Sequence, residues 1–504
     1  MTPHEIVAML NAVGVSPENL TADSRVVGAG DVFVAYPGHG GRRDGRDYIG
    51  AAIARGAAAV LWEREGFSWD PAWQVPNVAV PGLKPLAGEI ASLVYGAPSA
   101  QLAMVGVTGT NGKTSVSTWT AQALERCGVP CGVIGTLGSR FRGVGAVLAN
   151  TTPDAIVLQA TLRRMRDAGA QACAMEVSSI GLDQARVAGV AFDIGVFTNL
   201  TRDHLDYHGS MAAYENAKTT LFLRHGLQHA VVNIDDPMGV RLMARLGGSL
   251  RRIGYCIAGK SAVVPHVEDE GRLTAHDLRF DEHGVRFRVA GDFGESDVSA
   301  PVWGEFNVAN LLAVLGVLLA AGVPFERAVA ALDILESVPG RMNAMGGSNA
   351  PLVVIDYAHT PDALQQALAA LRPLAGARGG RLVVVFGCGG DRDPGKRAPM
   401  GMIAAQLADA VLLTSDNPRS EDPLAILAQI AAGAPAARIE VERAQAILLA
   451  ISGACAADVV LIAGKGHETV QEVAGRKLPF SDHDVARRAL QTRDVRDAGS
   501  ETPS

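Results

Sequence analysis

The sequence has no CxxC pair, no long basic tract and no apolar run long enough to cross a bilayer. Its cysteines are scattered and none stands at a metal-ligand spacing from a histidine: Cys127, Cys131, Cys173, Cys256, Cys388 and Cys455. Zinc sites and disulfide frameworks use clustered or regularly spaced cysteines, so the sequence favours neither. We predict that these side chains are buried, reduced thiols.

The charge balance also excludes one class of partner. Lys and Arg number 45 against 52 Asp and Glu, which gives a formal net charge of −7 at pH 7. A protein that binds the phosphate backbone of a nucleic acid uses an excess of basic residues. No nucleic-acid partner is therefore expected.

Targeting and membrane signals are absent as well. The N-terminal stretch "MTPHEIVAML" contains Glu5 and lacks an apolar core of signal-peptide length. The most apolar stretch, "NLLAVLGVLLAAGVP" at 310–324, is shorter than a bilayer span and ends in Gly-Val-Pro. We predict that it forms a buried helix, and that the protein is cytoplasmic with no membrane span.

The chain does have enough residues for several cores. Its 504 residues, 48% hydrophobic and 19% charged, describe a globular protein of more than one domain. Short β-branched runs alternate with Ala- and Leu-rich segments, which is typical of α/β layers around a mostly parallel sheet. Breaks rich in Gly, Pro and Ser at 94–102 and 335–342 predict three domains, with limits 1–98, 99–336 and 337–504. The segment "LRFDEHGVRFRVAG" predicts an antiparallel hairpin that turns at Glu282-His283-Gly284.

The strongest local signal is a strand, a glycine-rich loop and a helix within "LAMVGVTGTNGKTSVSTWTAQAL" at 102–124. Gly109 and Gly112 allow backbone N–H groups to approach phosphates, and the helix N-terminus adds a favourable dipole. Lys113 would reach the terminal phosphates and the Thr114 hydroxyl would bind Mg²⁺. The loop thus predicts a nucleoside triphosphate site.

This loop is a variant of the common phosphate-binding pattern. Five residues separate Gly106 from Gly112, where the usual pattern has four between its glycines. By itself the loop is compatible with a kinase, a motor protein, a switch protein or a ligase, so the function has to be inferred from other segments of the chain.

Polar residues follow two further apolar strands. Glu176 and Ser178 follow the run "ACAM", and a second run, "IGVF", precedes Asn199, Asp203, His204, Asp206 and His208. In an α/β sheet the carboxyl ends of the strands face the ligand crevice. Carboxylate and imidazole groups beside a phosphate loop suit a divalent ion held against phosphates.

Ten motifs occur in an order that resembles the Mur ligases of peptidoglycan synthesis: "GTNGKTS", "NTTP", "MEVSS", "FTNLTRDHLDYHG", "YENAK", "GEFNVANLLA", "DYAHTPDAL", "GCGGDRDPGKR", "DNPR" and "GKGHE". The resemblance runs from about Ser24 to Glu468. It is strongest to the members that add meso-diaminopimelate to UDP-N-acetylmuramoyl-L-alanyl-D-glutamate. It implies an N-terminal α/β domain that binds the UDP-sugar (1–98), a central ATP-binding P-loop domain (99–336) and a C-terminal Rossmann-like domain that binds the amino acid (337–504).

The resemblance also implies roles for residues of the nucleotide and metal site. Two Mg²⁺ ions are expected, held by Thr114, Glu176, His204 and Lys218, the last as an N-carbamylated side chain. From the residues alone, Lys218 would be a solvated helix residue, so its metal role rests on the resemblance. Lys113, Glu176, His204 and Lys218 would be catalytic. The implied ATP contacts are Gly109, Thr110, Asn111, Gly112, Lys113, Thr114, Ser115, Asn307, Asn310, Arg341, Asp356 and His359.

A second implied set holds the UDP-muramoyl-dipeptide: Ser24, His39, Asn150, Thr151, Thr152, Ser178, Gln184 and Arg186. The chain departs from the family in two places near this set. Ile180 stands where many members have His in "SSHGL", and "GHGG" stands where they often have "GHQ". These changes affect a supporting contact and the side chains of the UDP loop.

The third implied set holds the incoming diamino acid: Arg392, Asp416, Asn417, Pro418, Arg419, Gly464 and Glu468. These residues follow three apolar runs, so they are expected at strand ends of one sheet. Arg419 marks the diaminopimelate-adding members, as against the lysine-adding ones. Diaminopimelate is lysine with an additional carboxylate, and a guanidinium can bind that planar anion with two parallel hydrogen bonds.

The implied reaction transfers the γ-phosphoryl group of ATP to the D-glutamyl carboxylate, and the amine then attacks the acyl phosphate. The expected partners are small molecules only (the UDP-dipeptide, diaminopimelate and ATP), and the expected state is a monomer. Related alternatives are a lysine-adding ligase and a folylpolyglutamate synthase. More distant ones are an ATP-driven switch or motor protein and a non-catalytic sugar-nucleotide binder. The intact set Lys113, Glu176, His204 and Lys218 disfavours the last.

Overall fold

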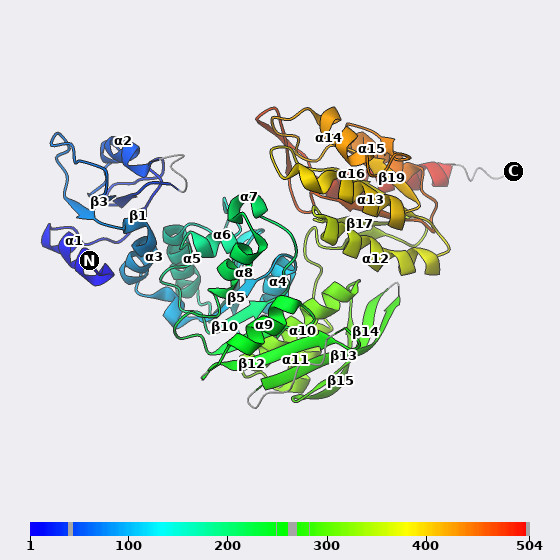
Figure 1. The fold of residues 1–504 in the computed structure, drawn as a ribbon, viewed down its shortest axis with the longest axis horizontal. Helices are drawn as coiled ribbons and strands as arrows, with labels where there is room; N and C mark the ends of the chain where they lie inside the picture. Colours follow the sequence, from blue (N-terminus) through cyan, green and yellow to red (C-terminus); the bar gives the residue numbers. More distant parts are fainter. Residues whose placement is uncertain (39–43, 248, 261–269, 282, 500–504) are drawn as a thin grey trace.

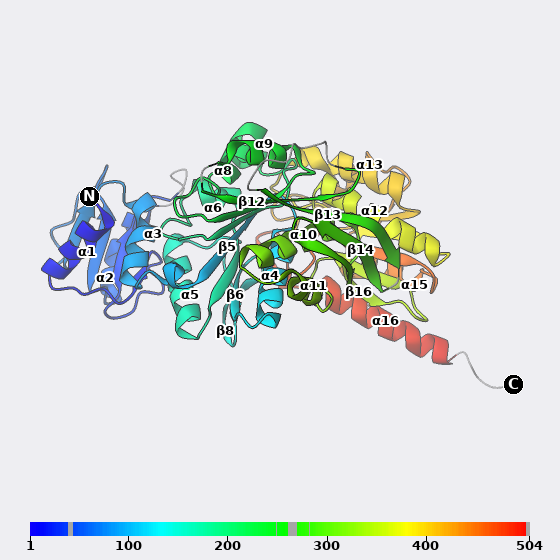
Figure 2. The same ribbon diagram turned by 90° about the horizontal axis from the view of Figure 1, so that it is seen from below.

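The computed structural model describes the chain except residues 39–43, 248, 261–269, 282 and 500–504. Its elements form three α/β domains in a row, with the largest in the middle and the chain termini in the outer two (Figures 1 and 2). In the part of the chain that is described, no helix is both long enough and apolar enough to span a membrane.

The N-terminal domain has a four-stranded parallel sheet in the order β1-β2-β3-β4. Thr2 caps the first helix in a capping box with Glu5. Apolar side chains of the strands pack against helices on both faces. The elements are α1 (Pro3–Ala12), β1 (Leu20–Thr21), β2 (Val32–Ala35), η2 (Gly45–Tyr48), α2 (Ile49–Ala54), β3 (Ala59–Glu63), β4 (Asn77–Val80), α3 (Leu83–Val94) and η3 (Pro98–Gln101).

The central domain is built on an eleven-stranded sheet in the order β15-β14-β13-β12-β11-β10-β5-β9-β6-β7-β8. Pairing is parallel from β13 to β6 and antiparallel at both edges. Its strands are β5 (Ala103–Thr108), β6 (Cys131–Gly135), β7 (Gly138–Phe141), β8 (Val144–Ala146), β9 (Ala172–Glu176), β10 (Ile194–Phe197), β11 (His229–Asn233), β12 (Arg251–Ile257), β13 (Glu270–Asp281), β14 (Gly284–Gly291) and β15 (Gly294–Ala300).

Helices cover the two faces of this sheet and bury a separate apolar core on each. They are α4 (Lys113–Arg126), α5 (Ala155–Asp167), α6 (Ser179–Asp183), α7 (Leu205–His208), α8 (Met211–Thr219), α9 (Pro237–Arg245), α10 (Glu305–Ala320) and α11 (Phe325–Leu332). The predicted buried helix is α10. Apolar residues occupy all sides of this helix, because it packs between the sheet, α4 and α11. The predicted hairpin is β13–β14, which is antiparallel, while Glu282 of its turn lies outside the described residues.

The C-terminal domain has a six-stranded sheet in the order β16-β17-β21-β18-β19-β20, parallel except for β16. A two-stranded hairpin, β22–β23, follows β21. The elements are β16 (Asn343–Gly346), β17 (Leu352–Asp356), α12 (Pro361–Ala377), β18 (Leu382–Phe386), η4 (Pro394–Lys396), α13 (Arg397–Leu407), β19 (Ala410–Leu413), α14 (Pro423–Ala431), β20 (Arg438–Ile439), α15 (Arg443–Ser452), β21 (Val459–Ala463), β22 (Val470–Val473), β23 (Arg476–Pro479) and α16 (Asp482–Gly499).

The cysteines are free thiols, and five of the six are buried as predicted. Cys455 is exposed, so the prediction was wrong at that position. It lies in the turn between α15 and β21, where its backbone N–H donates to Asp458 Oδ2 at 2.9 Å. The turn satisfies its backbone at the surface and therefore leaves the thiol outside the apolar core.

Candidate active site

The phosphate loop lies between β5 and α4, and its conformation requires glycine at Gly112. That residue has a φ of +84°, and a Cβ there would come within 2.5 Å of Asn310 Oδ1. The Lys113 ammonium folds back over the loop and donates to the carbonyls of Gly109 and Thr110 at 2.9 and 2.7 Å. Burial lowers the pKa of Lys113 from its ordinary value.

Asn199, at the end of β10, holds the middle of this loop. Its carbonyl accepts from the Thr110 N–H at 2.9 Å, and its Oδ1 accepts from the Asn111 N–H at 2.8 Å. These two amides are therefore already used within the protein. The free N–H groups at the beginning of α4 are the ones left to meet a phosphate.

Glu176, the last residue of β9, is buried and accepts three hydrogen bonds. It accepts from the Thr114 hydroxyl at 3.1 Å, from the Thr136 hydroxyl at 3.0 Å and from the Thr136 N–H at 2.7 Å. Arg341, which precedes β16, donates to the Thr114 hydroxyl at 3.0 Å. The central and C-terminal domains thus meet at the residue predicted to bind Mg²⁺.

Lys218 is not a solvated helix residue, which corrects the reading from the residues alone. Its side chain is 1% exposed, and its ammonium donates to the Gly109 carbonyl at 2.7 Å and lies 4.4 Å from the centre of the Tyr214 ring. The buried residues of α8 are Tyr214, Lys218 and Thr219, so the i, i+4 pair Tyr214 and Lys218 shares the inward face. Burial, with repulsion from Lys113, lowers the pKa of Lys218 well below its ordinary value.

His204 lies near the same loop in a left-handed backbone conformation, with a φ of +53°. Its Nε2 is 3.5 Å from Asp203 Oδ2. Burial lowers the pKa of His204, attraction to Asp203 opposes this, and the charges of Lys113 and Lys218 lower it further. The four residues predicted to be catalytic are therefore close enough to interact, through hydrogen bonds or through their charges.

A cavity of about 240 Å³ opens beside the phosphate loop, between the central and C-terminal domains. Asn111 Nδ2 donates to Asp362 Oδ2 of α12 at 3.2 Å and links the two domains across it. Burial raises the pKa of Asp356, and Asn310 Nδ2 donates to Asn307 Oδ1 at 3.1 Å. The lining of this cavity contains these predicted ATP contacts: Asn111, Gly112, Thr114, Ser115, Asn307, Asn310, Arg341 and Asp356.

A larger cavity, of about 890 Å³, lies between the same two domains. Its central-domain wall contains Asn150, Thr151, Ser178 and Arg186 of the predicted dipeptide set, together with Ile180 and His204. Its C-terminal wall contains His359 and most of the predicted diamino-acid set: Arg392, Asp416, Asn417, Arg419, Gly464 and Glu468. Tyr357 and Asp362 line both cavities and so stand between them.

The dipeptide wall is held together by its own hydrogen bonds. The Thr152 hydroxyl donates to Ser178 Oγ at 3.0 Å, and Arg186 donates to the Thr152 carbonyl at 2.9 Å. Gln184 Oε1 accepts from Arg186 at 2.7 Å, and Thr151 contacts Thr136 through their hydroxyls at 3.1 Å. Thr152 and Gln184 therefore support residues that face the cavity.

Of the predicted contacts on the UDP side, Ser24 does not line this cavity. Ser24 is in the N-terminal domain, in the loop between β1 and β2, and is half-buried. His39 lies outside the described residues. The structure therefore does not place Ser24 against the predicted substrate contacts that line the cavity.

The predicted diamino-acid residues follow β18, β19 and β21, which are parallel strands of one sheet, as expected. Gly464 has a φ of +112°, and a Cβ there would come within 2.5 Å of the Asp416 carboxylate. Arg392 is exposed at the cavity wall, whereas Asn417 and Pro418 are buried. The three strand ends thus form one wall with acidic and basic groups.

Arg419 is held by contacts with neighbouring segments through both its backbone and its side chain. It has a φ of +52°, it donates to the Gly390 carbonyl at 2.6 Å, and its Nε is 3.5 Å from Glu472 Oε2. Its N–H also donates to the Glu472 carbonyl at 3.0 Å. Strand β22 therefore fixes Arg419, a contact that the sequence did not predict.

Comparison with known proteins gives a consistent result along the chain. The family descriptions that match are Mur ligase family, catalytic domain (17–95), Mur ligase middle domain (107–318) and Mur ligase, glutamate ligase domain (340–466). The chain is 50% identical over 491 residues to the UDP-N-acetylmuramoyl-L-alanyl-D-glutamate–2,6-diaminopimelate ligase of Janthinobacterium sp. (strain Marseille), covering 96% of each.

The protein of the same description from Ralstonia nicotianae is 52% identical over 484 residues, covering 95% of this chain and 94% of that one. Among solved structures, one described as UDP-N-acetylmuramoyl-L-alanyl-D-glutamate–2,6-diaminopimelate ligase is 34% identical. It has a TM-score of 0.65 and covers 95% of each chain.

Proposed function

Because the chain belongs to the Mur ligase family, we propose that it joins meso-diaminopimelate to UDP-N-acetylmuramoyl-L-alanyl-D-glutamate at the expense of ATP. The observation that carries this proposal is the larger cavity. On one wall it has the residues that match the family's dipeptide contacts, and on the other it has Arg392, Asp416, Arg419 and Glu468. These two basic and two acidic groups complement an amino acid that carries two carboxylates and two ammonium groups.

Arg419 favours diaminopimelate over lysine as the added amino acid. Its guanidinium lies at the cavity wall, where it could hold the second carboxylate of diaminopimelate through charged hydrogen bonds worth roughly 1.5–3 kcal/mol each. Lysine lacks that carboxylate. A site built around a polar partner rejects an analogue without it by ~10⁴-fold.

ATP would occupy the smaller cavity. Arg341 lines it, and among the described residues the buried Nε of Arg341 has no hydrogen-bond partner, so a donor is available to a phosphate. Gly112 and the N-terminus of α4 face the same space. Asn307 and Asn310 would contact the base, and Asp356 would contact the nucleotide from the C-terminal domain. His359 lines the larger cavity, so it would contact the nucleotide from that side.

The residues present also fit a divalent ion beside the phosphates. The Thr114 hydroxyl and the Glu176 carboxylate are hard oxygen donors 3.1 Å apart, which suits Mg²⁺. A second ion would need a further anionic ligand beside Glu176 and His204, because the described residues contain no ready cluster of three His, Cys, Asp or Glu side chains. When bound, Mg²⁺ would neutralise the charge of the transferring phosphoryl group.

Lys218 would supply the missing ligand as a carbamate. Burial and repulsion from Lys113 lower the pKa of Lys218, which favours the uncharged amine that carbamylation requires. Its nitrogen can add to the carbon of CO₂ and release one proton, which converts a cation into a carboxylate-like anion. The place of Lys218 against Gly109 of the phosphate loop is suitable for that role.

In the proposed reaction, an oxygen of the D-glutamyl carboxylate attacks the γ-phosphorus of ATP, and ADP leaves. The amine of diaminopimelate then attacks the acyl carbon, phosphate leaves, and the amine loses a proton. Lys113 and Arg341 would hold the phosphates, while Thr151, Ser178 and Arg186 would orient the dipeptide. No side chain of the protein has to act as a nucleophile, so catalysis rests on positioning and electrostatics.

We assign UDP-sugar binding to residues 1–98, with Ser24 and His39 in its site, ATP binding to 99–336 and amino-acid binding to 337–504. We further propose that the protein acts as a monomer in the cytoplasm, where its ATP and amino-acid substrates are made. Domain closure would exclude water from the acyl phosphate.

Phosphate release tests this function. It should require ATP, the UDP-muramoyl-dipeptide and diaminopimelate together, and omission of any one should abolish it. Efficient release with lysine in place of diaminopimelate would support the lysine-adding alternative, and release with folates would support a folylpolyglutamate synthase. Release with ATP alone would contradict a ligase.

A further inference from the structure

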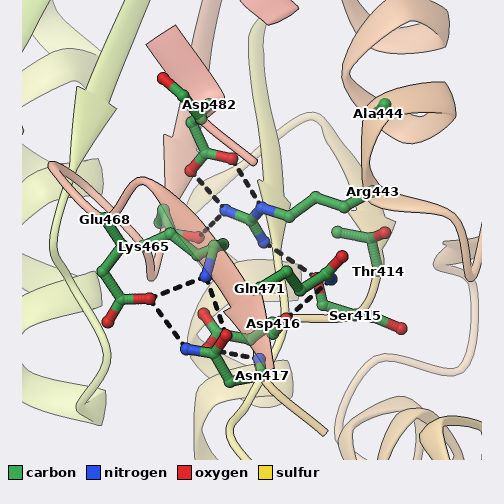
Figure 3. A network of polar contacts seen from close by, with 12 residues as sticks. Thr414, Ser415, Asp416, Asn417, Arg443, Ala444, Lys465, Glu468, Gln471 and Asp482 are labelled. Carbon is green, nitrogen blue, oxygen red and sulfur yellow. Dashed lines mark hydrogen bonds and ion pairs between the residues drawn. The ribbon is translucent and has the colours of Figure 1, made fainter. Parts of the chain in front are cut away.

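Lys465 is a fully buried cation directly behind the wall of the larger cavity. Its side chain has no exposed surface, and its ammonium donates to Asn417 Oδ1 at 3.0 Å, Glu468 Oε2 at 2.7 Å and the Val470 carbonyl at 2.8 Å (Figure 3). An ammonium has three protons, so these three acceptors saturate it. Lys465 therefore has no donor left for a substrate.

Most hydrogen-bonding groups of the Asn417 side chain are also occupied by protein partners. Its Oδ1 accepts from Lys465 and from the Glu472 N–H at 2.9 Å, and its Nδ2 donates to Glu468 Oε2 at 2.8 Å. At most one Nδ2 proton remains for a ligand. Glu468 Oε2 thus has two donors from the protein, whereas Figure 3 draws no contact to its other oxygen.

A second buried cation fixes the backbone beneath this group. Arg443 forms a two-bond ion pair with Asp482, with both bonds 2.7 Å long and neither side chain exposed. It also donates to the carbonyls of Ala463 at 2.9 Å and Ser415 at 3.3 Å. Those carbonyls directly precede Gly464 and Asp416, at the ends of β21 and β19.

The strands joined in this way are not neighbours, because β18 lies between β21 and β19 in the sheet. Backbone pairing alone therefore does not set the distance between Asn417 and Glu468. Two residues join the segments that follow β19 and β21. Arg443 donates to a backbone carbonyl of each segment, and Lys465 donates to the side chains of Asn417 and Glu468.

We propose that Lys465 is a positioning residue for the incoming amino acid. By holding Glu468 Oε2 and Asn417 Oδ1, it leaves Glu468 Oε1 to receive the distal ammonium of a diamino acid, beside the Arg419 that receives the carboxylate. The proposal rests on the proposed function, because it names Glu468 as an amino-acid contact. Lys465 would thus affect the affinity for the amino acid without contacting it.

The test is Lys465→Met, which keeps the length and volume of the side chain and removes the three hydrogen bonds. The KM for diaminopimelate should rise about 10- to 100-fold, as expected for the loss of one or two charged hydrogen bonds at the ligand. The KM values for ATP and for the UDP-muramoyl-dipeptide should stay within about twofold. Lys477→Met is the matched control, since Lys477 is exposed on β23 of the adjoining hairpin.

A double-mutant cycle distinguishes an effect of Lys465 through Glu468 from a general loss of structure at the site. If Lys465 acts through Glu468, then Lys465→Met should have little further effect on the diaminopimelate KM in a Glu468→Gln background. Additive effects in the cycle, or a rise in all three KM values, would overturn the proposal. Should Lys465→Met not fold, as judged by thermal unfolding, Lys465→Gln carries the same comparison.

Failure of this proposal can be told apart from failure of the proposed function. If the wild type releases phosphate with diaminopimelate and the folded Lys465 variants keep its KM, only the positioning role is wrong. If the wild type shows no release with diaminopimelate, the proposed function itself is wrong.

Discussion

The Thr114 hydroxyl donates to Glu176 Oε2 at 3.1 Å and accepts from Arg341 at 3.0 Å. One hydroxyl thus joins the start of α4, the end of β9 and the segment that leads into the C-terminal domain. Arrival of a metal ion at Thr114 would compete with both contacts. Nucleotide binding and the relative position of the two domains are therefore expected to be linked through this residue.

Thr114→Val keeps the shape of the side chain and removes the hydroxyl. Phosphate release should fall about 100-fold or more, because the metal and Arg341 lose a shared partner at the transferring phosphoryl group. Thr118→Val is the control, since Thr118 lies in the same helix and is buried, and its hydroxyl has no partner among the described residues. Equal activity losses in the two variants would mean that the effect comes from packing in α4.

Lys218→Ala should be inactive in the phosphate-release assay and should regain activity when a short carboxylic acid such as acetate is added. The added carboxylate would occupy the space of the missing carbamate and supply the same oxygen ligands. Acetamide has a similar size without the charge and should not rescue. An alanine variant that is active without any addition would rule out the carbamate.

Arg419→Ala should remove most of the preference for diaminopimelate over lysine, measured as the ratio of the two kcat/KM values. Arg419→Lys should recover little of it, because an ammonium keeps the charge and loses the two parallel donors. Glu472→Gln serves as a comparison, since it removes the charge that pairs with Arg419 and leaves the guanidinium in place. An unchanged preference in Arg419→Ala would show that another residue selects the amino acid.

Stability should depend on pH through His467. Burial, with repulsion from Arg341 and Lys465, lowers the pKa of His467 from 6.5 to about 4. Well above pH 6.5 His467 is unprotonated in both the folded and the unfolded state, so it does not make stability depend on pH there. As the pH falls from 6.5 towards 4, the unfolded chain binds a proton that the folded chain does not, and the free energy of unfolding decreases.

Urea unfolding at pH 7 and pH 5 measures this effect. The wild type should lose about 2 kcal/mol more between these pH values than His467→Gln, which has no group to protonate there. The other histidines are common to both proteins, so the difference isolates His467. Equal losses in the two proteins would contradict the lowered pKa.

Much of the fold could be predicted because local patterns agree with the tertiary structure. The apolar run at 310–324 falls largely within α10, and the segments that follow β9 and β19 bring Ser178 and Asp416 to the cavity wall, as the α/β rule requires. The alternating pattern around His283 likewise becomes the β13–β14 hairpin.

Other features depend on contacts between distant segments and could not be read from one segment. Lys218 is buried because α8 turns the face it shares with Tyr214 inward, towards the phosphate loop, and a single lysine in a polar helix gives no sign of that. Glu472 reaches Arg419 because β22 folds back along the segment that follows β19. Lys465 lies in the motif "GKGHE", but the sequence predicted a role only for Gly464 and Glu468 of that motif, because the three acceptors of Lys465 come together only in the fold.

The most direct test of the reaction is to follow an oxygen atom. The UDP-muramoyl-dipeptide is prepared with ¹⁸O in the D-glutamyl carboxylate and incubated with ATP and diaminopimelate, and the released phosphate is analysed by mass spectrometry. Attack of that carboxylate on the γ-phosphoryl group predicts that each labelled carboxylate oxygen lost on amide formation appears in phosphate. Phosphate without ¹⁸O, released while the tripeptide product forms, would contradict the acyl-phosphate route.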